Sequence, residues 1–273
     1  MQGDAHQMIA TRTEGRIGII AFNRPDVLNA FNQQLIREVN AALEALTADP
    51  AVLAIVVHGN GRAFSAGFDL KESAERNLTE VAEWRAILET DFRFIMQFWD
   101  CPKPTIAAVH GYCLAGAFEL ALACDITIAA EGTRFGEPEV RFGAGIVALL
   151  LPWVTGPKFA KELLLTGNDR IDASRAQAMG IVNQVVPEGE HFDRAMAMAR
   201  DLCAAAPAAV QLTKRAIQRG YDMMGQRQAL LAALDIDLQV SMSGGAERAE
   251  FNRLRREQGL QAALAWRDAR FSQ

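Results

Sequence analysis

The chain has few cysteines and lacks the spacings at which cysteines bind zinc or form a redox pair. Only 4 of its 273 residues are Cys. None of them forms a CxxC motif, and no histidine lies at zinc-ligand spacing from them. Three lie among apolar or small residues, which favours buried free thiols in a reducing compartment. We therefore expect no metal site, and free thiols at Cys101, Cys113, Cys124 and Cys203.

The chain also lacks a long hydrophobic run. The longest apolar stretch covers residues 146–154 and contains Pro152. A membrane-spanning helix needs about 20 apolar residues, so no such helix is expected. The first 16 residues contain no apolar core of the kind found in secretory signals. These features predict a cytoplasmic protein without a membrane partner.

An excess of positive charge is missing as well. The chain has 28 Lys and Arg against 33 Asp and Glu, which gives a formal net charge of -5. Nucleic-acid binding driven by phosphate neutralisation is therefore not expected. An anionic small molecule remains compatible, because a local basic pocket can exist in an acidic protein. Half of the residues are hydrophobic, enough for one large core or for one core with a small appended part.

What the sequence does contain is an alternation of apolar runs with helical patterns. It predicts an α/β fold with buried strands and right-handed crossovers. Expected strands cover residues 17–22, 53–58, 105–109, 125–130 and 182–186, and expected helices cover 29–46, 80–99 and 115–123. Later helices are expected at 191–205, 207–223, 226–242 and 245–267. We thus predict an α/β core over residues 1–200 and a helical C-terminal region over 201–273, which packs on the core or on a neighbouring subunit.

A loop rich in small residues follows the second expected strand. Residues 58–70 read HGNGRAFSAGFDL. A Walker phosphate loop would need a final GK[ST], and a dinucleotide fingerprint would need Gly where Phe64 stands. A nucleophile elbow around Ser65 would need glycines on both sides at two residues' distance, but Ala63 occupies one of these positions. Taken alone, the loop is most simply an ordinary turn.

A single carboxylate stands out in the short helix expected at 115–123. Glu119 is the only charge between Lys103 and Asp125. A buried isolated carboxylate raises its pKa or finds a partner. Glu119 lies one turn after Gly116, near a helix N-terminus whose free N–H groups suit a developing oxyanion. A catalytic role and a buried ion pair with a residue such as Arg141 are equally compatible with these residues.

Three motifs in this order resemble the crotonase (enoyl-CoA hydratase/isomerase) superfamily. The first is the G-x-G-x-x-F-S-A-G-x-D-L stretch at residues 59–70, and the second is the segment at 104–125 that ends in E-L-A-L-A-C-D. The third is the F-G-x-P-E segment at residues 135–139. The resemblance covers residues 17–187. It implies the crotonase (ClpP-like) fold, a spiral of ββα units.

The resemblance also implies roles for individual residues. The backbone N–H groups of Phe68 and Gly116 match the oxyanion hole, and Glu119 and Glu139 match the two carboxylates of hydratases. Glu137 matches a variable position, and we interpret it as solvent-facing or structural. In relatives the first motif also follows the coenzyme A. The matching positions are Ala66, Phe68, Asp69, Leu70, Lys71 and Gly116.

The activity that follows is hydration of a trans-2-enoyl-CoA at C2=C3, which yields a 3-hydroxyacyl-CoA. The alternatives are a Δ3-Δ2 enoyl-CoA isomerase and a CoA-thioester-binding protein with little turnover. A serine peptidase of the Clp type would need a triad that no histidine here indicates. The CoA enters as the substrate thioester, so no separate cofactor is implied. Relatives form trimers or dimers of trimers, so a homotrimer or homohexamer is expected.

Some segments depart from the family pattern. Ala115 and Ala117 replace frequent glycines, and residues 141–153 are more apolar and bulkier, which predicts a bulkier helix at the acyl end. The C-terminal segment matches poorly, and its arginines at 253, 255 and 256 are expected on a solvated helix face. The four histidines are not expected to cluster. They are His6, His58, His110 and His191.

Overall fold

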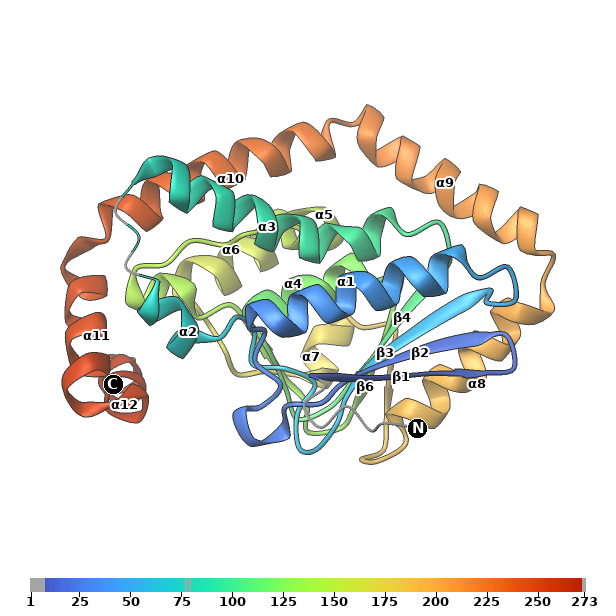
Figure 1. The fold of residues 1–273 in the computed structure, drawn as a ribbon, viewed down its shortest axis with the longest axis horizontal. Coiled ribbons are helices and arrows are strands. Elements are labelled where there is room, and N and C mark those ends of the chain that lie inside the picture. The colour runs from blue at the N-terminus through green and yellow to red at the C-terminus, as the bar shows by residue number, and fades with distance from the viewer. Residues whose placement is uncertain (1–7, 77, 79, 272–273) are drawn as a thin grey trace.

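The computed structural model describes residues 8–76, 78 and 80–271 and has a six-stranded sheet at its centre (Figure 1). The sheet order is β1-β2-β3-β4-β6-β9. Neighbouring strands are parallel, except that β1 pairs antiparallel with β2. The strands are β1 (Ile9–Glu14), β2 (Ile17–Phe22), β3 (Ala54–Gly59), β4 (Thr105–Val109), β6 (Ile126–Ala130) and β9 (Gln184–Val186). The five predicted strands are confirmed within two residues, whereas β1 was not predicted.

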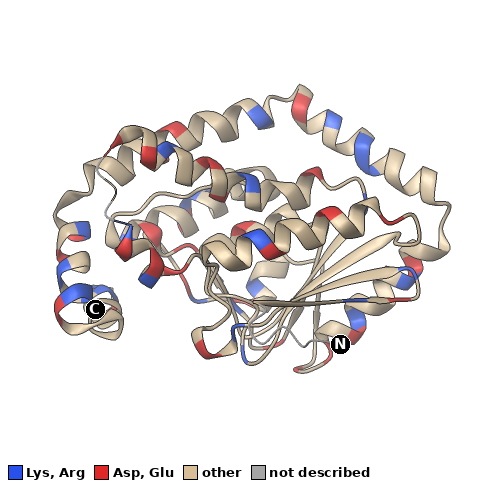
Figure 2. Ribbon diagram, in the orientation of Figure 1, with Lys and Arg blue, Asp and Glu red and all other residues tan. Residues whose placement is uncertain are grey.

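Helices cover both faces of this sheet, which explains why its inner strands are continuous apolar runs. Successive side chains of a strand point to opposite faces. On β3, Ile55 and Val57 join the larger core, which lies under α1, α3 and α4. Ala54 and Val56 join a smaller core with Ala195 of α8. Neither face is left to solvent, so charged residues are almost absent from the central strands (Figure 2).

The helices follow the predicted pattern, with two informative differences. Helix α1 begins at Gln33 instead of 29, because the side chain of Asn32 caps it by accepting a hydrogen bond from the Leu35 N–H at 2.9 Å. The single helix predicted at 245–267 is wrong. Gly259 adopts φ 90° and divides it into α11 and α12. The principal helices are α1 (Gln33–Ala48), α3 (Val81–Asp100), α4 (Gly116–Ala123), α8 (His191–Ala204), α9 (Pro207–Met223), α10 (Gln226–Ser243), α11 (Gly245–Gln258) and α12 (Leu260–Ala269).

The remaining elements are short. A second sheet has the order β5-β7-β8. Its strands are too short for a hydrophobic period and were not predicted. The short elements are η1 (Pro25–Val27), α2 (Leu70–Glu75), β5 (Tyr112–Leu114), β7 (Arg134–Gly136), η2 (Glu139–Phe142), α5 (Leu151–Val154), α6 (Pro157–Thr166), β8 (Ile171–Asp172) and α7 (Ala173–Ala178).

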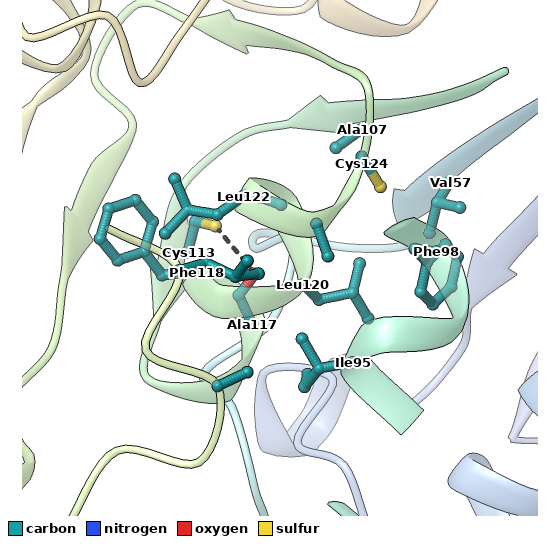
Figure 3. Close-up of a cluster of buried hydrophobic side chains, with 14 of the residues drawn as sticks. Val57, Ile95, Phe98, Ala107, Cys113, Ala117, Phe118, Leu120, Leu122 and Cys124 are labelled. Carbon is teal, nitrogen blue, oxygen red and sulfur yellow. Dashed lines mark hydrogen bonds between the residues drawn. The ribbon is translucent and has the colours of Figure 1, made fainter. Parts of the chain in front are cut away.

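Helix α4 lies inside the protein and is buried along its whole length. Figure 3 shows its apolar side chains packed against α3 and the sheet, with Leu120 between Ile95 and Phe98 on one side and Phe118 on another. The Cys113 thiol donates to the carbonyl of Ala117 at 3.4 Å. Cys101, Cys113 and Cys124 are buried free thiols, as predicted, and Cys203 is a partly exposed one.

Beyond α8 the described chain is helical. Helix α9 runs along the outside of the molecule, and α10 returns beside α3 (Figure 1). Helices α11 and α12 pack on each other and on η2 through Phe251 and Phe142, whose rings stack at 4.9 Å. Among the helices of the described residues, none has the length and apolar character that crossing a bilayer requires.

Candidate active site

The glycine-rich loop after β3 is held in place by buried polar side chains. The Ser65 hydroxyl donates to the Asn29 carbonyl at 2.8 Å and accepts from the Gly67 N–H at 3.1 Å. The amide of Asn29 donates to the carbonyls of Asn60 and Ala63 at 2.9 and 2.8 Å. Ser65 is thus a buried structural residue and not a nucleophile. Asn29 is a supporting residue that the sequence analysis did not identify.

The same loop lies beside the N-terminus of α4. Residue 65 pairs with Cys113 and residue 68 with Phe31 in isolated parallel bridges. Gly67 has φ +85°, and a Cβ added to it would lie 2.7 Å from the Ala115 Cβ and 3.0 Å from the Gly116 nitrogen. The backbone on either side of the Gly67–Phe68 bond is therefore in close van der Waals contact with the first turn of α4.

The N–H groups of Phe68 and Gly116 remain available in this arrangement. Neither donates a hydrogen bond to another of the described residues. Gly116 is the first residue of α4, so its N–H has no partner within the helix. The ring of Phe68 covers Gly116, where an added Cβ would lie 2.4 Å from the ring. The backbone segments that carry Phe68 and Gly116 therefore lie side by side.

Ala115, which replaces a glycine that is frequent in the family, adopts φ 57° and ψ −138°. Non-glycine residues rarely occupy this region, and the strain costs on the order of 1–3 kcal/mol. The surrounding hydrogen bonds hold it there, because the Ala115 N–H donates to the Gly136 carbonyl at 2.8 Å and its carbonyl accepts from the Phe118 N–H at 2.8 Å. The close approach of the two segments is thus kept despite the missing glycine.

Glu119 lies one turn into α4 and is 2 % exposed. Its carboxyl oxygens accept hydrogen bonds from the backbone N–H groups of Val147 and Ala148, at 3.3 and 2.6 Å. The alternative pairing with Arg141 is wrong, because Arg141 instead contacts Asp169 at 3.3 Å. Of the stretch 141–153, in which a helix was expected, residues 143–150 are not helical, and a helix forms only at its end, in α5. The irregular backbone of residues 143–150 leaves N–H groups free to hold Glu119.

Glu139 opens η2, and its backbone carbonyl accepts a hydrogen bond from Ala144 at 3.0 Å. Its side chain is buried, and Oε2 has no hydrogen-bond partner within the described chain. Glu137 is buried as well, at 1 % exposure, and its Oε2 also has no hydrogen-bond partner within the described chain. The solvent-facing interpretation of Glu137 is therefore wrong. Three carboxyl groups share one buried region.

Burial dominates the electrostatics of these three groups. Burial raises the pKa of Glu119 well above its usual range, and the charge of Glu139 raises it further, against the hydrogen bonds from Ala148 and Val147. Burial raises the pKa of Glu139 to about 7, while its hydrogen bond with Glu137 lowers it. Burial, then the charges of Glu139 and Glu119, raise the pKa of Glu137 well above normal. Near neutral pH the cluster therefore holds protons that ordinary carboxylates have lost.

The remaining residues of the first motif lie at the start of α2. Asp69 caps α2 by accepting from the Lys71 N–H at 3.0 Å, and it pairs with Arg24 at 2.9 Å. Arg255 of α11 donates to the Leu70 carbonyl at 2.6 Å, so this arginine is not on a purely solvated face. Ala66 is partly exposed and Lys71 is exposed. These positions are accessible beside the Phe68 N–H.

Comparison with known proteins agrees with this geometry. The enoyl-CoA hydratase/isomerase family model matches residues 12–272. The chain belongs to the enoyl-CoA hydratase/isomerase family. It is 33% identical over 273 residues to a crotonyl-CoA hydratase of Syntrophomonas wolfei, with 98% of each chain covered. It is 37% identical to a short-chain-enoyl-CoA hydratase of Clostridium acetobutylicum, over 76% of this chain and 79% of that one.

The solved structures of the family give the same architecture. A crystal structure of an enoyl-CoA hydratase/isomerase from Xanthobacter autotrophicus Py2 superimposes with a TM-score of 0.96 at 49% identity, covering 98% of this chain and 100% of that one. The crotonase-type α/β fold predicted from the motifs is thus confirmed, including the C-terminal helices. Family membership supports an enzyme that acts on acyl-CoA substrates.

The family site is separate from a hollow of about 370 Å³ that lies between α9 and the core. That hollow is lined by Trp99, Asp125, Lys214 and Tyr221 among others, and by none of the carboxyls described above. Lys214 and Asp125 form an ion pair at 2.6 Å there. The charges of these two lining residues are therefore paired with each other.

Three histidines of this family member do cluster, contrary to the prediction. His58 is the second-last residue of β3, His110 follows β4, and His191 begins α8. The rings of His110 and His191 stack at 4.5 Å, and His58 lies 4.6 Å from Phe192. His6 lies outside the described residues. No group of metal-binding side chains occurs in the described chain, so the cluster is a packing contact between α8 and the sheet.

The histidine cluster predicts an acid-sensitive contribution to stability. Burial lowers the pKa of His58 from 6.5 to about 4, and the nearby Arg12 and His110 lower it further, against a hydrogen bond with Gly59. Above pH 6.5 both the folded and the unfolded states hold His58 neutral. Between pH 6.5 and 4 the unfolded state takes up the proton first, so the free energy of unfolding falls.

A His58→Gln variant should lose this contribution. The free energy of unfolding of both proteins is measured by urea titration at one protein concentration. Between pH 6.5 and pH 5 the wild type should lose about 2 kcal/mol more than the variant. It should stay constant between pH 7 and 8. A difference that is flat across the whole range would show that His58 titrates normally in the folded protein.

Proposed function

We propose that this protein is an enoyl-CoA hydratase, which adds water across the C2=C3 bond of a trans-2-enoyl-CoA and yields a 3-hydroxyacyl-CoA. The observation that carries this proposal is the pair Glu119 and Glu139. Both are buried, and Glu119 lies one turn from Gly116, whose backbone lies against the Gly67–Phe68 segment. An isomerase needs one base, whereas water addition uses an acid and a base together.

The geometry supports a simple division of the chemistry. The N–H groups of Phe68 and Gly116 hydrogen-bond the thioester oxygen and stabilise the enolate that forms when water attacks C3. Glu119 and Glu139 share one proton near neutral pH, because their charges oppose each other's ionisation. The ionised member removes a proton from the attacking water, and the protonated member delivers a proton to C2. The CoA is part of the substrate and is released unchanged in the product thioester.

The coenzyme A part is proposed to follow Ala66 and residues 69–71. Ala66 and Lys71 are accessible there, and the ion pair of Asp69 with Arg24 fixes the start of α2 beside the Phe68 N–H. Lys71 supplies a positive charge on an otherwise acidic protein. This placement puts the thioester at the two N–H groups and directs the acyl chain toward Glu119 and Glu139.

The direct test is hydration of purified enoyl-CoA by the wild type. Loss of the conjugated enoyl absorbance should be followed with crotonyl-CoA, a longer enoyl-CoA and an aromatic enoyl-CoA. A trans-3-enoyl-CoA, which lacks this conjugation, should be followed for a gain of the same absorbance, which marks isomerisation. Hydration of at least one trans-2-enoyl-CoA, with the 3-hydroxyacyl-CoA identified by mass, is expected. Conversion of the trans-3 substrate without hydration would favour the isomerase, and binding without turnover of any substrate would favour a CoA-thioester-binding protein.

We also propose a cytoplasmic homotrimer or homohexamer, with residues 201–273 supplying much of the contact. Helices α9 and α10 expose large apolar side chains, of which Met223 is 89% and Leu212 and Ile236 are each 61% exposed. Surfaces of this kind usually mark an interface. Light scattering should give three or six times the chain mass of 29.8 kDa, and a monomer would contradict the assembly. The buried free thiols agree with a reducing compartment.

A further inference from the structure

A buried carboxyl group outside the reacting pair touches the segment that holds Glu119. Asp237 of α10 is 4 % exposed, and its Oδ1 accepts a hydrogen bond from the Ser241 hydroxyl at 3.1 Å. The same oxygen lies against Gly145, where an added Cβ would lie 2.0 Å from Oδ1 and 3.0 Å from the Asp237 Cα. Only a residue without a Cβ therefore fits between α10 and residues 143–148 at this point.

Helix α10 provides a rigid base for this contact. It packs along α3, and one of its faces is buried in the larger core through Leu230, Leu234 and Leu238. The start of the segment is held as well, because the Arg248 guanidinium of α11 donates to the Gly143 carbonyl at 3.3 Å. The C-terminal helices thus hold residues 143–145 at two points.

The segment held in this way leads directly to the two groups that orient Glu119. The N–H groups of Val147 and Ala148 donate to its carboxyl oxygens at 3.3 and 2.6 Å. Gly145 lies two residues before Val147, so a displacement of Gly145 carries both donors with it. Because residues 143–150 form neither a helix nor a strand, their position depends on these contacts with other elements.

We propose that Asp237 is a positioning residue, which sets the place of Gly145 and, through it, the two N–H groups that orient the Glu119 carboxyl. The inference rests on the proposed function of Glu119. It gives the C-terminal region a task within its own subunit, in addition to the proposed assembly. Asp237 acts through Glu119 and takes no part in the proton transfers.

Gly145→Ala tests the contact directly. The added methyl group would overlap Asp237, so the segment must retreat from α10 and move the N–H donors that orient Glu119. The kcat should fall by about 100-fold, the usual effect of misplacing a catalytic group by about 1 Å. The KM should change little, because the coenzyme A part is proposed to bind at Ala66 and residues 69–71.

A second substitution should rescue the first. Asp237→Ala alone leaves a space beside Gly145, so it should lower kcat, though less than Gly145→Ala does. In Gly145→Ala/Asp237→Ala the added methyl group fills that space. The double variant should therefore be faster than either single variant and about tenfold faster than Gly145→Ala. A double variant as slow as the product of the two single effects would overturn the inference.

Gly156→Ala is the matched control for adding a methyl group. Gly156 has φ −69°, and a Cβ there would meet no atom within 4 Å. The φ of Gly145 also lies outside the left-handed region, so alanine suits the backbone at both positions. Gly156→Ala should keep the wild-type kcat when rates are compared well below the melting temperatures.

The Glu119→Gln background separates positioning from general support of the fold. If Gly145 acts through Glu119, adding Gly145→Ala to Glu119→Gln should slow the remaining hydration by no more than about threefold. A general structural defect would instead lower kcat by a similar factor in both backgrounds. That result, or a wild-type kcat in Gly145→Ala, would overturn the inference.

Hydrogen exchange gives a readout without turnover, by mass spectrometry of the peptide that covers residues 143–150. In Gly145→Ala and in Asp237→Ala the N–H groups of Val147 and Ala148 should exchange about tenfold faster than in the wild type, and the double variant should return toward the wild-type rate. Unchanged exchange in both single variants would contradict the proposal.

The two readouts keep the inference apart from the proposed function. A wild type that hydrates no enoyl-CoA would refute the proposed function alone, because exchange still tests the hold of Asp237 on residues 143–148. If Gly145→Ala does not fold, Asp237→Ala in the wild-type and Glu119→Gln backgrounds supplies the same comparisons of kcat and exchange. Equal loss of kcat in those two backgrounds would then overturn the inference.

Discussion

Replacing either Glu119 or Glu139 with glutamine should reduce kcat for crotonyl-CoA hydration, or for the preferred enoyl-CoA, by about 10²- to 10⁴-fold, the usual contribution of a general acid or base. The glutamine side chain keeps the size and polarity of the carboxyl group but cannot exchange the proton that the pair shares. Because each carboxyl needs the other in its complementary state, the double variant should be scarcely slower than the single ones.

The two variants should differ in stability, which provides an internal check. Glu139→Gln removes a buried carboxyl whose pKa burial raises to about 7. The pKa of this carboxyl is lower in the unfolded chain. Above pH 7 the folded wild type therefore contains a buried carboxylate ion, which water stabilises better in the unfolded chain. The substitution removes this ion and should raise the free energy of unfolding. In Glu119→Gln, an amide NH₂ faces the backbone N–H of either Val147 or Ala148, so one hydrogen bond is lost. This substitution should lower the free energy of unfolding.

A surface carboxylate supplies the matched control. Glu162 pairs with Arg175 at 2.7 Å, and its side chain is 52% exposed. Glu162→Gln should keep the wild-type rate and lose little stability, since exposed ion pairs contribute about 0–1 kcal/mol. If Glu119→Gln hydrates enoyl-CoA as fast as this control, the two-carboxylate mechanism is refuted. Turnover of a trans-3-enoyl-CoA by Glu119→Gln would then favour an isomerase that uses Glu139 alone.

The parts of the fold that were predicted from the sequence are those whose signal is local. The strands of the central sheet are buried on both faces, so their apolar runs are continuous and easily found. Single residues also mark boundaries, as Pro207 does at the start of α9. By contrast, the strand β1 has one buried residue in six and no apolar pattern. The break at Gly259 was missed because the helical period continues on both sides of it.

In the site, too, contacts between segments far apart in the chain could not be predicted from the sequence. Glu119 stood out because its own helix is otherwise apolar, but its partners are backbone N–H groups from a segment 28 residues away, which no residue type reveals. Glu137 looked like a loop charge because it stands between Gly136 and Pro138 in a segment without a hydrophobic period, whereas contacts with distant segments bury it. The histidine cluster did have a signal. His58 lies at the end of β3 and His110 directly follows β4, and the carboxyl ends of these adjacent parallel strands meet at one edge of the sheet.

Substitution of Gly67 with alanine should reduce kcat by about 10²- to 10³-fold, the effect of losing one oxyanion donor. A Cβ at this position would lie 2.7 Å from the Ala115 Cβ and 2.8 Å from the Leu114 carbonyl oxygen. One of these atoms is a backbone oxygen and the other is a Cβ, so neither can move away through a side-chain rotation. The loop must then retreat from α4, which separates the Phe68 and Gly116 N–H groups. KM should change less than kcat, because the donors act mainly on the enolate.

The change also forces alanine into a backbone conformation with φ +85°. Gly189→Ala controls for that cost, because Gly189 has φ +87° and a Cβ there would meet no atom within 4 Å. Strain of about 1–3 kcal/mol is expected in both variants, so both should melt at a lower temperature. Only Gly67→Ala should lose activity when the rates are compared well below either melting temperature. Equal rates in the two variants would show that the close approach of Gly67 to α4 serves folding alone, and the enolate would then need another donor than the Phe68 N–H.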